Sequence, residues 1–100
     1  MKIKIYQIPE EKDRRNLMFR NYENAQSRGG IDLAEYDLVF DGEVEANSLE
    51  NVYCLFNQHS LIPQDYRGRS LSVSDIVETA AGFFFCDSVG FVELEREGAQ

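Results

Sequence analysis

Tryptophan is absent from this chain, and histidine occurs once, proline twice and cysteine twice in 100 residues. One histidine and two cysteines leave no ligand spacing for zinc, so we expect neither a metal nor a cofactor. No apolar run approaches the ~20 residues that span a bilayer. The Lys/Ile alternation at residues 2–5 is unlike the long apolar stretch of a signal peptide. We therefore expect a cytoplasmic protein.

The two cysteines, Cys54 and Cys86, both lie in apolar stretches of the sequence. This pattern predicts buried, reduced thiols; a disulfide and a reactive thiol are the alternatives. The one histidine, His59, would lie roughly 140° from Cys54 around a helix, so the two cannot form a nucleophile–base pair on one helical face. His59 is instead expected at a helix C-terminus, where a cation favours the helix dipole.

Positive charge is missing from a long central segment, since no Lys or Arg occurs from Gly29 to Tyr66. Residues 1–30 hold seven Lys/Arg and four Asp/Glu (net +3), whereas residues 31–100 hold three and fourteen (net −11), for a total of −8. Such an acidic surface repels nucleic acid and membranes, so we expect neither as a partner. It either attracts a basic protein or is a solvated face that keeps the protein monomeric or weakly dimeric.

The remaining composition suits one modest core. Hydrophobic residues make up 43% and aromatic residues 12% of the chain, unlike a disordered sequence. A length of 100 residues fits a single domain over 1–100 and needs no disulfide.

In the N-terminal half, residues 2–6 alternate polar and apolar and predict a half-buried strand. The apolar patch 17–19 is a possible second strand, and residues 21–28 predict a short helix that ends at Gly29 and Gly30. A turn of helix over 32–36 should lead into extended chain over 37–44, interrupted by a turn or bulge at Gly42.

The clearest helix is predicted over 48–59. Asn47 and Glu50 have the spacing of a capping box. An apolar stripe at i, i+3, i+4 and i+7 should pack on the sheet. The stripe consists of Leu49, Val52, Tyr53 and Phe56.

After this helix, residues 70–74 alternate like a strand, and 75–79 also read as extended. Residues 83–87 and 91–94 predict two antiparallel strands joined by a hairpin loop, with Gly90 at a positive φ. The expected fold is α+β: a small, mainly antiparallel sheet, formed by the N-terminal strand and the C-terminal hairpin, packed by one main helix and a shorter one.

Carboxylates supply the candidate interaction residues. Asp41, Glu43 and Glu45 alternate, so on a strand they would share one face at roughly 6.6 Å spacing. Such a row could imitate a phosphate backbone, or it is the wet face of a half-buried strand. The full set of candidates is Asp32, Glu35, Asp37, Asp41, Glu43 and Glu45.

Catalytic chemistry finds little support in the residues. Asp75 and Asp87 lie beside apolar segments, but an Asp at such positions more often accepts backbone N–H groups in a turn or cap. The 68–72 segment lacks the final glycine of a nucleophile elbow and has no histidine partner. Arg67 and Arg69 flank Gly68 and either grip one anion or lie in an ordinary solvated loop.

Four stretches of the chain resemble one known family. Residues 69–77 (RSLSVSDIV), 85–91 (FCDSVGF), 3–8 (IKIYQI) and 36–57, in which YDLVFDG precedes LENVYCLFN, are similar in order and spacing to the YodL-like domain family. The signature residues are Ser70, Leu71, Ser72, Val73, Ser74, Asp75, Asp87, Ser88, Gly90 and Phe91. The resemblance implies a non-enzymatic interaction module of bacterial mobile elements, and it carries no catalytic residues.

Three functions therefore remain. The first is a protein-interaction module that uses the segment 32–50 and the exposed side of the C-terminal hairpin. The second is an acidic DNA mimic of the antirestriction type, which requires one contiguous acidic face. The third is a small hydrolase or transferase that uses Asp75, Asp87 and Cys86, which requires at least two of these groups to converge in a pocket.

Overall fold

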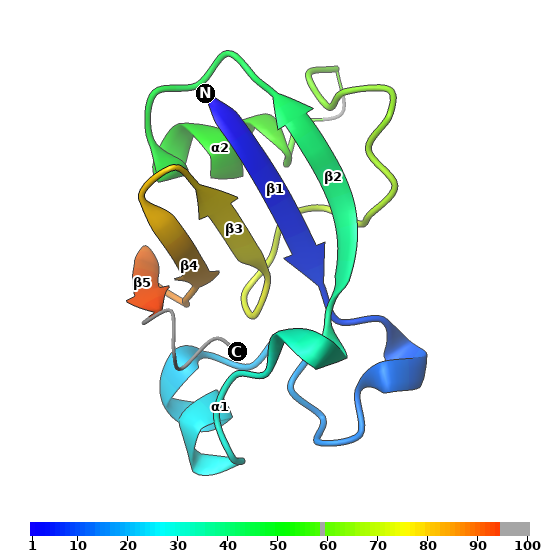
Figure 1. The fold of residues 1–100 in the computed structure, drawn as a ribbon, viewed down its shortest axis with the longest axis vertical. Coiled ribbons are helices and arrows are strands. Elements are labelled where there is room, and N and C mark those ends of the chain that lie inside the picture. Colours follow the sequence, from blue (N-terminus) through cyan, green and yellow to red (C-terminus); the bar gives the residue numbers. More distant parts are fainter. Residues whose placement is uncertain (59, 95–100) are drawn as a thin grey trace.

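Five antiparallel strands form one sheet in the computed structural model, which describes residues 1–58 and 60–94 (Figure 1). Their order across the sheet is β2-β1-β3-β4-β5. The strands are β1 (Lys2–Gln7), β2 (Asp37–Glu43), β3 (Ile76–Thr79), β4 (Gly82–Cys86) and β5 (Phe91–Leu94). The helices are α1 (Tyr22–Ser27) and α2 (Leu49–Leu55), with 3-10 turns η1 (Glu10–Lys12) and η2 (Leu33–Glu35). The α+β prediction is confirmed. Among the described residues, no helix has the length and apolar character to cross a membrane.

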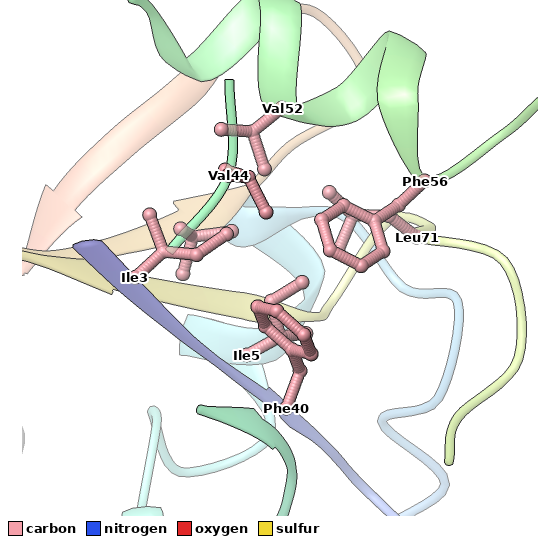
Figure 2. Close-up of a cluster of buried hydrophobic side chains, with 8 residues drawn as sticks. Ile3, Ile5, Phe40, Val44, Val52, Phe56 and Leu71 are labelled. Atoms are coloured by element: carbon pink, nitrogen blue, oxygen red, sulfur yellow. The ribbon is translucent and has the colours of Figure 1, made fainter. Parts of the chain in front are cut away.

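The larger hydrophobic cluster lies on one face of the sheet. Because successive side chains of a strand point to opposite faces, β1 sends Ile3 and Ile5 into this cluster and Lys2 and Lys4 to the other side. There the two isoleucines meet Val52 of α2 and Phe56, the residue that follows this helix, together with the other buried members (Figure 2). Those members are Phe40, Val44, Leu71 and Val77.

The second cluster lies on the opposite face, toward the end of the sheet where Figure 1 shows α1. It joins Ile76 and Phe85 of the sheet to Ala25 of α1. The buried Tyr36, which follows η2, donates its hydroxyl to the carbonyl oxygen of Ser74 at 2.7 Å. Each face of the sheet thus has its own core. Helices as short as α1 and α2 are not stable alone, so packing against these cores stabilises them.

The main helix is shorter than its periodicity suggests and begins with a different cap. The side chain of Ser48 accepts a hydrogen bond from the backbone N–H of Asn51 at 3.1 Å, so the capping box predicted at Asn47 is wrong. The helix ends at Leu55, whereas the prediction extended to 59; His59 itself lies outside the described residues. Tyr53 is 39% exposed and does not belong to the core stripe.

Two predicted strand-like segments are turns. In residues 17–19, Phe19 has φ 68°, and the carboxylate of Asp13 accepts the backbone N–H groups of Leu17 at 2.6 Å and Met18 at 3.0 Å. In residues 70–74, Ser74 has φ 87°, which no β-strand permits. In both places, polar side chains that bind the backbone locally override the strand signal, which was an apolar patch in 17–19 and an alternation in 70–74.

The irregularity predicted at Gly42 lies elsewhere on β2. Ile5 pairs with Phe40 and Tyr6 with Leu38, so the bulge falls at Val39, whereas Gly42 pairs regularly with Ile3. A Cβ at position 42 would lie 2.9 Å from the ring of Phe40. Glycine is therefore required here for aromatic packing and not for a turn. The C-terminal hairpin is confirmed, including the positive φ of 72° at Gly90.

Candidate functional site

A groove of about 340 Å³ separates α2 from the C-terminal hairpin. Its α2 side consists of Glu50, Tyr53 and Cys54. Its other side consists of Val73, Cys86, Asp87, Ser88, Gly90 and Phe91. Segments distant in sequence thus form one surface, which is why the residue pattern alone did not reveal it.

The groove combines apolar surface with the carboxylates of Glu50 and Asp87. Tyr53 offers an exposed ring, and Phe91 is only partly buried. Cys54 is exposed, so the prediction that both thiols are buried is wrong for this residue; Cys86 is buried as predicted, and both are free. Burial raises the pKa of the Cys86 thiol to about 12, so this thiol stays protonated and is a poor nucleophile.

Asp87 holds the hairpin turn and ties it to α1. Its Oδ1 accepts hydrogen bonds from the backbone N–H of Ser88 at 2.8 Å and of Tyr22 at 3.0 Å. Its own N–H donates to the carbonyl oxygen of Gly90 at 2.9 Å. The expected role of Asp87 as a turn acceptor is confirmed.

Asp75 holds the preceding loop, residues 70–74, in place from inside the protein. It is fully buried, and its Oδ2 accepts hydrogen bonds from the N–H of Ser72 at 2.7 Å and from Nε2 of Gln7 at 2.9 Å. Desolvation raises the pKa of its carboxyl to about 7, against the hydrogen bonds from Ser72 and Gln7 and the attraction of Arg69. Asp75 does not line the groove, whereas Cys86 and Asp87 both do. Two of the three groups considered for catalysis therefore meet there, but the thiol of Cys86 stays protonated and Oδ1 of Asp87 already accepts two backbone N–H groups.

Gln7 and Tyr66 are the residues that sequence reasoning missed. The Nε2 of Gln7 also donates to the hydroxyl of Tyr66 at 3.0 Å and to the carbonyl oxygen of Arg69 at 2.9 Å. Its Oε1 accepts the N–H of Arg69 at 3.1 Å. One signal was present: Gln7 occupies an inward position of β1, where a buried amide needs polar partners.

The first three of the acidic interaction candidates, Asp32, Glu35 and Asp37, already make contacts within the chain. Asp37 forms an ion pair with Lys12 at 2.7 Å, and Glu35 with Arg15 at 2.6 Å. Asp32 caps η2 by accepting the N–H of Ala34 at 3.0 Å.

The other three lie on or just beyond β2. Asp41 is directly opposite Lys4, and Glu43 directly opposite Lys2, on the neighbouring β1. Glu45 is exposed beyond the end of the strand. Since directly opposed residues of antiparallel strands share a face, the acidic row alternates with lysines. This arrangement gives DNA mimicry no support.

The ten residues that carry the family resemblance lie in two places in the structure. Six of them, the run from Ser70 to Asp75, form the loop before β3, and the other four surround the hairpin turn. The model of the YodL-like domain matches residues 2–96. The chain belongs to the YodL-like domain family. No curated protein and no solved structure matches it.

The geometry gives this YodL-like domain two kinds of signature residue. Ser72, Ser74 and Asp75 make internal hydrogen bonds that shape the loop. Val73, Asp87, Ser88, Gly90 and Phe91 line the groove. Within the part of the chain that the structure describes, no cluster of three His, Cys, Asp or Glu side chains is placed to hold a metal ion.

Proposed function

We propose that this YodL-like domain is a non-enzymatic protein-interaction module that binds its partner in the groove between α2 and the C-terminal hairpin. The observation that supports the proposal is that Val73, from the loop before β3, lines one hollow together with four hairpin residues, all from stretches that resemble the family. A residue that a family shares in an exposed loop indicates recognition more strongly than one shared in a core, where packing is the usual reason. The proposed setting, the cytoplasm of a bacterium that carries a mobile element, rests on the family resemblance.

The chemistry of the groove favours a basic protein segment with one apolar side chain. Tyr53, Val73 and Phe91 provide aromatic and aliphatic surface for that side chain. Glu50 and Asp87 line the same groove, and the chain around α2 carries no Lys or Arg from Gly29 to Tyr66. A Lys or Arg beside the apolar anchor would therefore find opposite charge and no competing cation.

Photo-crosslinking in the native cytoplasm tests this function. Ser88 lines the groove and is exposed, so a photoreactive residue there should capture a defined protein partner. A photoreactive residue at Gln26, which is exposed on α1, is the matched control. Val73→Lys should abolish the Ser88 crosslink, because a buried cation would replace the apolar contact. Equal crosslinking from both positions, or persistence in the Val73→Lys variant, would contradict the proposal.

A further inference from the structure

A second hollow, which shares no lining residue with the groove, is lined in part by Arg69. It has a volume of about 240 Å³ and is lined mainly by Gln7, Pro9, Asp37, Arg67, Gly68 and Arg69. We call it the arginine notch. Two guanidinium groups thus line a concave surface on a protein whose net charge is −8.

The Arg69 side chain is held in place by a hydrogen bond, an ion pair and an aromatic ring. Its Nη2 donates to the carbonyl oxygen of Ile8 at 3.2 Å and lies 3.6 Å from Oδ1 of Asp75. Its guanidinium lies 5.2 Å from the ring centroid of Phe19. Its Nε is buried and has no hydrogen-bond partner among the described residues, whereas the side chain as a whole is 34% exposed. A guanidinium fixed in this way loses little conformational freedom when its exposed part binds a carboxylate.

Gly68 fixes the spacing between the two arginines. A Cβ at this position would lie 2.3 Å from Oε1 of Gln7, so only glycine lets the loop approach β1 so closely. On one side of it, the N–H of Arg67 donates to the carbonyl oxygen of Val39 at 3.2 Å. On the other, the N–H of Arg69 donates to Gln7. The backbone of both arginines is therefore hydrogen-bonded to the sheet, which fixes the positions from which the two side chains extend.

Phe19 adds an exposed aromatic ring next to Arg69. The ring is 56% exposed although the residue has φ 68°, a conformation that bulky side chains rarely adopt. Such strain persists only where surrounding contacts enforce it. Here the N–H of Phe19 donates to Oγ of the buried Ser74 at 3.0 Å. The loop thus holds an apolar ring in solvent beside a positioned guanidinium.

We propose that the arginine notch and Phe19 form a second recognition surface, which binds a protein segment carrying one carboxylate beside an apolar side chain. The carboxylate bonds to Arg67 and Arg69, and the apolar group covers Phe19. Asp37, the acid in the notch, is neutralised by its ion pair with Lys12 at 2.7 Å. A nucleic acid is disfavoured because its many phosphates would meet a net charge of −8. A free phosphate would leave the ring uncovered.

Titration of the ¹⁵N-labelled protein with N-acetyl-L-phenylalanine, which combines one carboxylate with one ring, tests the proposal. The backbone amide signals of Phe19, Gly68 and Arg69 should shift together and reach saturation. N-acetyl-L-phenylalaninamide lacks the carboxylate and acetate lacks the ring, so both should bind at least about fivefold more weakly. Arg67→Ala should weaken binding of N-acetyl-L-phenylalanine by about tenfold, as expected for a lost charge-assisted contact. Phe19→Ala should reduce it to the level of acetate.

Arg14→Ala is the matched control, because Arg14 is an exposed arginine that does not line the notch. It should leave the affinity unchanged. Three outcomes would overturn the proposal. They are equal shifts with acetate and N-acetyl-L-phenylalanine, equal losses in Arg14→Ala and Arg67→Ala, and tighter binding of inorganic phosphate or of a single-stranded DNA oligonucleotide.

Discussion

At the residue scale, Asp75 is the group whose chemistry is most changed by folding. In the folded protein its carboxyl has a pKa of about 7 against an ordinary value of 3.8, because it is desolvated. The folded state therefore retains a proton that the unfolded state loses. The stability contributed by Asp75 is fully present below pH ~4, falls as the pH rises through 7, and is constant above that. The loss amounts to about 1.4 kcal/mol for each pH unit that separates the two pKa values.

Asp75→Asn removes this titration while keeping an oxygen that can accept from Ser72 and Gln7. We expect the variant to lose the decline in unfolding free energy between pH 5 and pH 8, and to match or exceed the wild type at pH 8. Urea denaturation followed by circular dichroism across this range measures both. Asp65→Asn, in an exposed loop, is the control. Parallel pH profiles for the wild type and Asp75→Asn would show that the buried carboxyl is not the cause.

Ser74 combines a buried hydroxyl with a positive φ of 87°. Ser74→Ala keeps the unfavourable backbone conformation and removes the acceptor for Phe19, so we expect a loss of about 1–3 kcal/mol. Ser74→Gly removes the same acceptor but relieves the backbone strain, and should be about 1 kcal/mol more stable than Ser74→Ala. Chemical denaturation of the two variants separates these effects. If the alanine variant is the more stable, the backbone at this position is not strained.

At the element scale, α2 shows why helix boundaries are harder to predict than helix existence. The spacing of Val52 and Phe56 correctly indicates a buried helical face. The spacing of Asn47 and Glu50 matches a capping box, yet Ser48 is the cap. Neighbouring Asn and Ser have nearly equal preferences for this position. Only the path of the chain from β2 decides between them.

The two cap assignments predict different mutational effects. Ser48→Ala should cost about 1 kcal/mol of stability, since the N–H of Asn51 loses its acceptor. Asn47→Ala, at an exposed position without that bond, should be within a few tenths of a kcal/mol of the wild type. Thermal unfolding of both variants provides the comparison. A larger loss for Asn47→Ala would restore the capping box that the sequence suggested.

At the scale of the whole molecule, the sequence predicted what local periodicity controls and missed what distant contacts control. The sequence predicts a strand over 2–6, extended chain over 37–44 and a hairpin that includes 91–94 and Gly90; the structure has strands at Lys2–Gln7, Asp37–Glu43 and Phe91–Leu94. The groove cannot be predicted from the sequence in this way, because it forms only where α2 and the hairpin meet in the folded protein. Nor was the loop 70–74 recognised as a turn, since its conformation depends on partners as distant in sequence as Gln7 and Tyr36. Interaction surfaces depend on these distant contacts. Composition alone therefore pointed to the acidic strand, and not to the groove, as the interaction surface.

The charge distribution yields a prediction for the same scale. Only part of the excess of negative charge is offset by ion pairs such as those of Asp37 and Glu35, so the folded protein repels itself. Raising NaCl from 20 to about 500 mM shortens the Debye length below ~5 Å and should raise the unfolding free energy. Glu45→Lys removes one exposed carboxylate beyond β2 and should both stabilise the protein at low salt and reduce its response to salt. Urea denaturation at the two salt concentrations tests this. A wild type that loses stability in high salt would mean that the ion pairs outweigh the repulsion, and that the negative charge is already balanced within the fold.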